Sequence, residues 1–135
     1  EEFPELTFVR GEAAIYEHIE REDPGLFAQI RNLVHEGRWD VVGGTYVQSD
    51  MNLPSTTTLL RQFEAGNAYF ESRFGRRARV GWSPDAFGHS AGLPEILSAS
   101  GIDSYIYCRP GAGVGQPVGP AFWWESASAA RVLCY

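Results

Sequence analysis

Lysine is absent from this sequence, and all eleven basic residues are arginines. This absence excludes a Schiff-base lysine and a lysine that clamps phosphate within these 135 residues. Cysteine is scarce as well: Cys108 and Cys134 are too few for a disulfide scaffold. Both lie in apolar, strand-like runs, which predicts two buried reduced thiols, and a bridge between neighbouring strands stays open.

Long hydrophobic runs and an excess of positive charge are also missing. No stretch approaches the roughly 18 apolar residues of a membrane span, and no charged-then-apolar signal sequence opens the chain. Seventeen acids against eleven bases give a net charge of -6, which argues against nucleic acid as the main partner. We therefore expect neither a membrane nor a nucleic acid as partner. The compartment stays open, although an arginine-only basic set with many glycines is typical of GC-rich bacterial genomes and would favour the cytoplasm.

Hydrophobic residues make up 44% of the chain and aromatic residues 13%, enough to build a core. Strand-like and helical patterns alternate. Strands are expected near residues 6–9, 39–46, 79–82, 102–108, 122–124 and 131–135, and helices near 12–21, 24–34, 55–74 and 93–97. Strands that alternate with helices imply parallel crossovers and an α/β fold class. The Gly/Pro-rich loop 110–120 is the sole candidate boundary, and its length fits a functional loop better than a linker.

Three elements carry clear boundary signals. Asp23-Pro24 is a strong helix start, with Leu26 and Phe27 on the inward face that follows. Ser55 is the expected cap of the longest helix, in which Leu59, Leu60, Phe63, Phe70 and Phe74 are predicted to point inward. The glycines at 43 and 44 predict a bulge or a close approach of two backbones.

Polar residues follow three of the expected strands. Asp50 follows the second strand, Asp85 the third and Arg109 the fourth. Because the carboxyl ends of parallel strands share one edge, all three are expected near one another. Two carboxylates and an arginine there suit a sugar, or a metal together with a sugar, although loops are polar in any case.

Asp85 is the sharpest of these candidates. The pattern Trp-x-Pro-Asp sets an acid behind a rigid proline at a strand end, with Phe87 supplying an apolar surface beside it. This suits a carboxylate nucleophile or a metal ligand, and the alternative is a helix cap for the segment near Ser90. His89 lies four residues on, but Gly88 argues against a helical Asp/His metal pair, which favours a structural or supporting role for His89.

Two further features have a functional and a plain interpretation. Arg109 either orients a substrate oxygen or pairs with an acid such as Asp103. The adjacent Trp123 and Trp124 either stack on a sugar or, as we favour, lie one in the core and one on the opposite face. The three histidines form no H-x-D or H-E-x-x-H pattern, so no complete metal site is visible.

Five ordered motifs resemble the catalytic domain of glycoside hydrolase family 38, the α-mannosidases, in its bacterial-type branch. They are residues 37–44 (GRWDVVGG), 50–55 (DMNLPS), 61–63 (RQF), 82–90 (WSPDAFGHS) and 93–97 (LPEIL), and the closing FWWE and RVL runs are similar as well. The likeness covers nearly the whole chain in the right order.

This resemblance implies a retaining, zinc-dependent α-mannosidase on a seven-stranded β/α barrel, acting on mannose-containing glycans. It makes Asp85 both the nucleophile and a zinc ligand, and it places Phe87 and Arg109 in the substrate site. The residue matching His89 is not a zinc ligand of the family. Asp50 receives no acid/base role from the resemblance, and we interpret it as a pocket or supporting residue.

Several family features differ or lack a match in this chain. Tyr46 and Gln48 stand where bacterial members usually have Trp and Glu, and Arg10-Gly11 replaces an expected Ser-Gln. The family's His-x-Asp zinc pair, acid/base aspartate and last zinc histidine have no match. We therefore expect residues 1–135 to be about half of one barrel domain, cut at both ends, inactive alone and poorly stable.

Other functions stay open at this point. The rivals are another barrel hydrolase, such as a polysaccharide deacetylase or an α-glucan enzyme, a non-catalytic carbohydrate-binding or regulatory domain derived from such a barrel, and a plain structural domain.

Overall fold

A computed structural model describes residues 3–109 and 120–135 of the chain. Strands and helices alternate through most of it. The elements are β1 (Phe8–Arg10), α1 (Ala13–Glu22), α2 (Pro24–His35), β2 (Trp39–Val41), α3 (Thr56–Phe74), β3 (Val80–Ser83), α4 (Leu93–Ala99), β4 (Ser104–Tyr107), β5 (Phe122–Glu125) and β6 (Arg131–Cys134). The predicted α/β class is confirmed.

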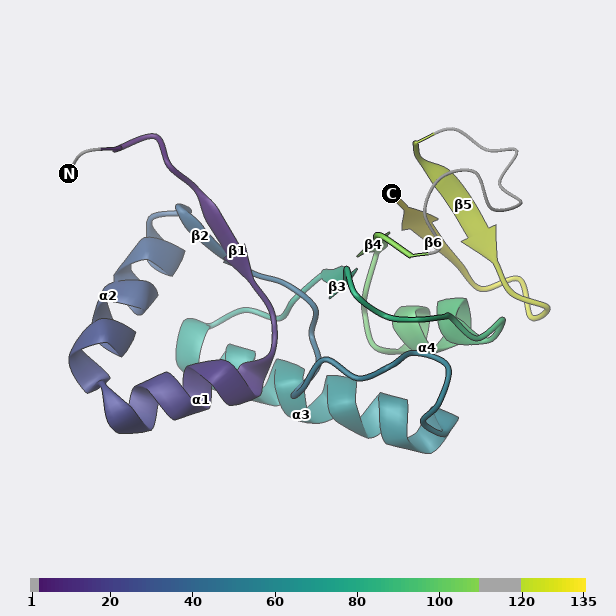
Figure 1. The fold of residues 1–135 in the computed structure, drawn as a ribbon, viewed down its shortest axis with the longest axis horizontal. Helices are drawn as coiled ribbons and strands as arrows, with labels where there is room; N and C mark the ends of the chain where they lie inside the picture. The colour runs from purple at the N-terminus through teal and green to yellow at the C-terminus, as the bar shows by residue number, and fades with distance from the viewer. Residues whose placement is uncertain (1–2, 110–119) are drawn as a thin grey trace.

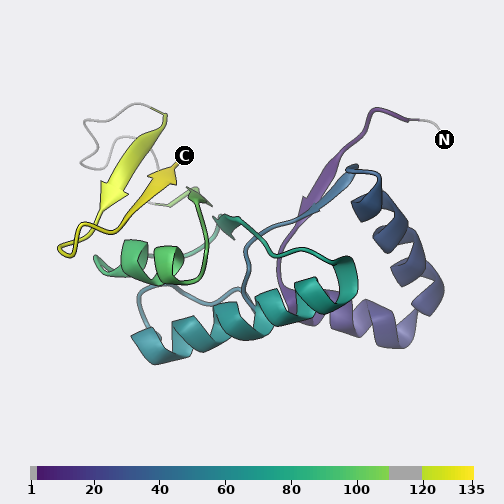
Figure 2. The same ribbon diagram turned by 180° about the vertical axis from the view of Figure 1, so that it is seen from behind.

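The strands form two groups in which parallel pairing dominates. β1 pairs with β2, and the second group has the order β3-β4-β6-β5, in which β5 alone runs antiparallel to its neighbour. A backbone bond from Gly43 N to the Val80 oxygen, 2.7 Å long, joins the end of β2 to β3. In both views α1, α3 and α4 lie along one side of the row of strands (Figures 1 and 2). The described residues form an open α/β layer, and no closed barrel is present among them.

The helix boundaries follow from local capping. The Asp23 carboxylate accepts a bond from Leu26 N at the start of α2, and the Ser55 hydroxyl accepts one from Thr58 N at the start of α3. Gly75 closes α3 with φ 68°, a left-handed conformation that suits glycine. Two inward predictions were wrong: Leu26 and Leu60 are exposed, because each stands about 100° of helix rotation away from its buried neighbour, Phe27 or Leu59.

Close backbone packing explains why the predicted strand 39–46 ends early. Gly43 and Gly44 both have φ 81°, so the chain leaves the strand after Val41. α3 then crosses this segment at Gly66, where an added Cβ would lie 2.3 Å from the Thr45 carbonyl carbon. The close approach predicted for the two glycines is therefore confirmed, and Gly66 is its counterpart on the helix.

Two hydrophobic clusters fill the space between helices and strands. The amino-terminal cluster includes Tyr16, Phe27 and Phe70, and the carboxyl-terminal cluster includes Phe63, Tyr105 and other buried residues of α3, α4, β4 and β6. α3 contributes to both clusters, so this helix connects the two halves of the chain.

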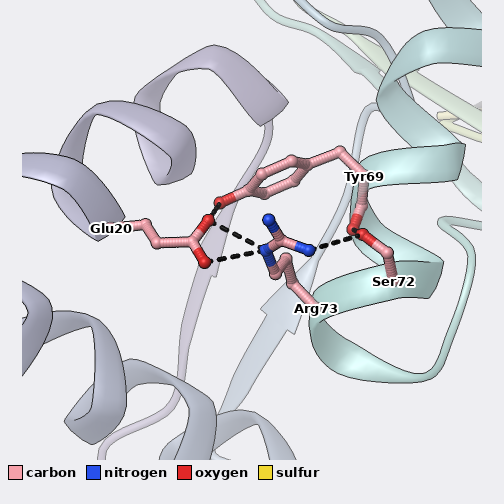
Figure 3. A network of polar contacts seen from close by, with 4 residues as sticks. All are labelled: Glu20, Tyr69, Ser72 and Arg73. Carbon is pink, nitrogen blue, oxygen red and sulfur yellow. Dashed lines mark hydrogen bonds and ion pairs between the residues drawn. The ribbon is translucent and has the colours of Figure 1, made fainter.

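A polar network of Glu20, Tyr69, Ser72 and Arg73 joins α1 to α3 (Figure 3). The Glu20 carboxylate accepts bonds from the Tyr69 hydroxyl at 3.0 Å and from Arg73 Nε at 2.8 Å. These bonds hold the pKa of Glu20 below its ordinary value, chiefly through the hydrogen bond from Arg73. The network is partly exposed, and it includes none of the strand-end residues that the sequence singled out.

The cysteine prediction was half right. Both thiols are free; Cys134 is buried, and burial raises its pKa to about 11. Cys108, however, is exposed, because it comes just after Tyr107, where β4 has ended. In the described part of the chain no helix has the length and apolar character needed to cross a membrane. The predicted loop 110–120 falls outside the described residues except for Pro120.

Candidate functional site

The chain turns sharply at the carboxyl end of β3. Ser83, the last strand residue, is fully buried, and Ala86 is buried again, whereas the Asp85 side chain between them is 68% exposed. Pro84 fixes the backbone where the strand ends. The segment therefore presents the Asp85 carboxylate to solvent, while the buried residues Ser83 and Ala86 anchor the backbone on either side of it.

Arg109 holds this carboxylate from the end of the neighbouring strand, β4. Its Nη2 lies 2.9 Å from Asp85 Oδ1, and its Cζ lies 4.8 Å from the centre of the Phe87 ring. Of the three strand-end residues expected to converge, Asp85 and Arg109 are thus in direct contact, and Phe87 supplies the apolar surface predicted beside Asp85. The alternative partner Asp103 pairs instead with Arg79 at the opposite end of the strands.

Asp85 does not cap the following helix. The N-cap position of α4 is Gly92, without a side-chain hydrogen bond, so the capping alternative for Asp85 was wrong. Its contacts with Arg109 come from a second loop rather than from local backbone.

His89 lies just behind this pair and connects it to β4. Its Nε2 lies 2.7 Å from the Arg109 carbonyl oxygen, and its Nδ1 lies 3.1 Å from the Tyr105 hydroxyl. Burial holds the pKa of His89 below its ordinary value, and this effect outweighs the bond to Arg109 and the nearby charge of Asp50. The ring is therefore neutral near pH 7.

Asp50 lies on the segment next to His89. Met51 forms an isolated parallel bridge with His89, and the Asp50 carboxylate accepts a bond from Asn52 N at 2.8 Å. Asp50 thus stabilises the loop after β2 through its bond with Asn52 N, and its charge acts on the nearby His89 ring. Asp50 is linked to the other two strand-end residues through the bridge between Met51 and His89.

A hollow of about 550 Å³ opens beside these side chains. Aromatic rings and a few polar groups line it: Asn52, Phe87, Gly88, His89, Tyr107, Arg109, Phe122 and Trp124. Concave, aromatic-rich sites with few polar groups are typical of small-ligand binding. A larger hollow of about 830 Å³ lies between the ends of α2 and α3, remote from every strand-end candidate.

The two tryptophans divide as favoured from the sequence. Trp124 packs against the carboxyl-terminal cluster and lines the 550 Å³ hollow, whereas Trp123 is 58% exposed on the other face of β5. Arg131 covers the Trp123 ring, with its Cζ 4.8 Å from the ring centre. Trp124 therefore adds an apolar wall to the site, and Trp123 does not.

Sequence reasoning missed Glu12, at the carboxyl end of β1. Its φ of 66° is uncommon for a residue with a side chain, and such strain gathers at functional sites. Its carboxylate binds Arg10 Nη2 at 2.7 Å and accepts a bond from Gln48 N at 3.3 Å. Arg10, Glu12 and Gln48 border a small hollow of about 140 Å³ that reaches Trp82 of β3. The strand-end rule would have found Glu12 had it been applied to the first strand.

The site does not by itself form a metal centre. Within residues 3–109 and 120–135, no three His, Cys, Asp or Glu side chains gather closely enough to hold an ion. Structural and catalytic zinc sites use three or four protein ligands, and Asp85 supplies one candidate oxygen donor. The residues described here therefore do not fit a complete zinc site.

Comparison with known proteins identifies the family of this chain. The model of the glycosyl hydrolases family 38 N-terminal domain matches residues 1–135. Human alpha-mannosidase 2C1 is 35% identical over 133 residues, which cover 98% of this chain and 13% of that protein. Alpha-mannosidase G of Dictyostelium discoideum is 36% identical over 134 residues, 98% of this chain and 12% of its own. The chain thus spans about an eighth of the length of these two curated relatives.

Solved structures agree on the fold. An alpha-mannosidase from Enterococcus faecalis superposes with a TM-score of 0.83 at 18% identity, over 97% of this chain and 15% of that chain. A 4-alpha-glucanotransferase from Thermococcus litoralis reaches 0.80 at 16% identity, over 99% of this chain and 22% of that one. The fold is therefore shared by enzymes of different specificity, and the sequence match discriminates between them. On that match, the chain belongs to glycosyl hydrolase family 38, within its N-terminal domain.

Proposed function

We propose that this chain is part of the catalytic β/α-barrel domain of a longer retaining α-mannosidase, called the parent protein below. The observation that carries the proposal is the exposed Asp85 carboxylate, held at a parallel strand end between Arg109 and Phe87 beside an aromatic hollow. Family membership and relatives named alpha-mannosidase support mannose-containing glycans as the substrate class. In the complete domain the open layer of strands would continue into a seven-stranded barrel.

In this proposal Asp85 is the nucleophile. One carboxylate oxygen attacks the anomeric carbon, the bond from that carbon to the glycosidic oxygen breaks, and a second carboxyl group gives its proton to the departing oxygen. Water, deprotonated by the same second group, then attacks the anomeric carbon and releases Asp85 as a carboxylate. We assign the second carboxyl group to a part of the parent protein outside this chain.

The neighbours of Asp85 have distinct tasks. Arg109 fixes the direction of the carboxylate through the contact of its Nη2 with Oδ1. Phe87, 77% exposed, offers an apolar face to the sugar ring. Asp50 supports the edge of the pocket from the loop after β2. All three residues bind or orient, and together they hold the reacting atoms in place before the chemical step.

Zinc belongs to the same proposal. Asp85 would be the ligand supplied by this chain, and the remaining ligands would come from other parts of the parent protein. When bound, the ion would hold sugar hydroxyls and support distortion of the ring. Because one ligand cannot retain zinc, we expect the 135-residue chain alone to be inactive.

The test compares two charge-removing variants of the parent protein. Asp85→Asn should reduce turnover of an aryl α-mannoside to background. Asp103→Asn, which breaks the pair with Arg79 at the opposite strand ends, is the matched control and should keep wild-type turnover. Full activity of Asp85→Asn would contradict the assignment of the nucleophile.

A substrate panel separates the rival functions. Wild-type turnover of α-mannosides, with no release of acetate from acetylated glycans and no action on α-glucans, supports the proposal. Preference for either of the other substrates would replace the mannosidase with a different barrel hydrolase. Saturable mannose binding without turnover of any of them would indicate a non-catalytic carbohydrate-binding domain.

A further inference from the structure

His89 joins three segments that meet at the strand ends. Its ring bonds to the Tyr105 hydroxyl on β4 and to the Arg109 carbonyl after β4, and its backbone bridges to Met51 after β2. The ring also packs against Tyr107 and Trp124, with ring centres 4.8 and 6.2 Å away.

The partners of the ring fix its tautomer. A carbonyl oxygen only accepts, so the bond to Arg109 requires a proton on Nε2. In the neutral ring Nδ1 is then the acceptor, and the Tyr105 hydroxyl donates to it. Burial raises the pKa of Tyr105, so this hydroxyl keeps its proton. The two hydrogen bonds therefore run in one direction: the Tyr105 hydroxyl donates to His89 Nδ1, and His89 Nε2 donates to the Arg109 carbonyl oxygen.

Arg109 needs such an anchor. Its side chain is 52% exposed, and a long exposed arginine loses conformational freedom whenever it is held in one geometry. The contacts with Asp85 and Phe87 act on the guanidinium, whereas the bond from His89 acts on the backbone of the same residue. Both ends of Arg109 are thereby fixed relative to the loop that carries Asp85.

We propose that His89 is a positioning residue that acts through Arg109, with Tyr105 holding the ring at Nδ1, so that the guanidinium stays on the Asp85 carboxylate. The inference rests on the proposed function only for the role of Asp85 as nucleophile. His89 touches no reacting atom in this account. Its effect is to keep the Asp85–Arg109 pair assembled before substrate arrives.

The kinetic test uses three variants of the parent protein on an aryl α-mannoside. His89→Phe keeps a ring of similar shape but loses the donor to Arg109, and kcat should fall on the order of 10- to 100-fold while KM changes little. His89→Gln keeps an N–H donor at a similar reach and should restore most of kcat. His18→Phe, at an exposed histidine on α1, is the matched control and should be silent. Unchanged kcat in His89→Phe, or no rescue by His89→Gln, would overturn the inference.

Tyr105→Phe covers the case in which His89→Phe fails to fold. It removes one hydroxyl from a fully buried ring and leaves the aromatic packing in place. With the ring held by one hydrogen bond instead of two, kcat should fall a few-fold, about 3- to 10-fold, in the same direction as for His89→Phe. Wild-type kcat in Tyr105→Phe would show that the hydroxyl does not act through His89.

A structural readout separates this inference from the proposed function. Crystal structures of the parent protein and of His89→Phe should show the Arg109 guanidinium on Asp85 in the first and displaced in the second. If the parent protein lacks mannosidase activity but this displacement is seen, the proposed function fails and the positioning role stands. If the parent protein is active and Arg109 does not move, the positioning role fails and the function stands.

Discussion

The two ends of the parallel strands carry ion pairs of the same chemistry in different surroundings. At the amino end, Arg79 pairs with Asp103, so the starts of β3 and β4 are held together. On the helices nearby, Arg73 pairs with Glu20 and ties α3 to α1. Glu20 and Arg73 lie on helices, whereas Arg79 and Asp103 stand directly before their strands.

At the carboxyl end, Asp85 and Arg109 join two loops instead of two regular elements. Phe87 lies under the guanidinium, and the aromatic hollow opens alongside. A pair in this place adds little to the stability of the sheet, because both side chains are more than half exposed. What it does is hold a carboxylate in one direction beside a cavity.

The difference teaches that the position of a charge pair, more than its strength, separates scaffold from site. Removing a pair at the amino end should change stability slightly and leave activity alone. Removing the pair at the carboxyl end should lower activity strongly and change stability little.

The largest expected effect concerns the scaffold that both ends share. Gly66→Ala in α3 would place a Cβ 2.3 Å from the Thr45 carbonyl carbon, and the backbone there cannot yield as a flexible side chain would. We expect a loss of about 3 kcal/mol in the free energy of unfolding, measured by denaturant titration of the parent protein. Gly92→Ala is the control, since φ is -85° and nothing lies within 4 Å of its Cβ. Equal stability of the two variants would contradict the close packing of α3.

The next effect is on activity and falls at the carboxyl end. Arg109→Met should lower kcat of the parent protein on the order of 100-fold, because the Asp85 carboxylate loses the donor that orients it. The melting temperature should change by no more than a few degrees. Arg79→Met, the same substitution at the amino end, should leave kcat unchanged. A similar kcat loss in both variants would remove the distinction between the ends.

A smaller effect should appear as a pH dependence of stability. The folded state lowers the pKa of His89, chiefly by burial and in spite of Asp50 and the Arg109 carbonyl. The unfolded chain therefore binds a proton at higher pH than the folded chain, and His89 lowers stability as pH falls below about 6.5. Unfolding titrations at pH 8 and pH 5 should show this loss, and His89→Gln should reduce it. An unchanged pH dependence in His89→Gln would assign the loss to other groups.

The smallest effect is expected at the contact between α1 and α3. Glu20→Gln removes a carboxylate whose pKa is held low by Arg73. This carboxylate stabilises the fold at pH values above its ordinary pKa, and the stabilisation is lost as pH falls through its lowered pKa. Because the pair is exposed, the melting temperature should drop by at most about 3 °C, and 1 M salt should erase the difference. Turnover should be unaffected. A kcat loss here would show that the site depends on the α1–α3 contact.

The sequence predicted the order of elements and the strand-end residues well. Asp23 and Ser55 mark helix starts by their short polar side chains, and the structure gives both the predicted capping bonds. Asp85 and Arg109 were found because parallel strands bring their carboxyl ends to one edge, whatever the details of packing. Such rules depend on local chemistry and on topology, both of which a single chain reveals.

What the sequence did not reveal depends on contacts between distant segments. Nothing around Gly66 announces that α3 meets the backbone of Thr45, and nothing around Glu12 announces its positive φ. The exposure of Cys108 follows from where β4 ends, a boundary that apolar composition alone does not set. The sequence favoured a supporting role for His89, but its hydrogen-bond partners, Tyr105 and Arg109, lie 16 and 20 positions away and could not be read from the local pattern.

The central claim is that the carboxyl end of β3 carries the nucleophile, and covalent trapping tests it most directly. The parent protein is incubated with a fluorinated mannosyl fluoride that forms its glycosyl-enzyme faster than water releases it, and the labelled peptide is then sequenced by mass spectrometry. The account predicts one sugar per protein, attached to the peptide that contains Asp85. A sugar attached to any other residue would contradict it.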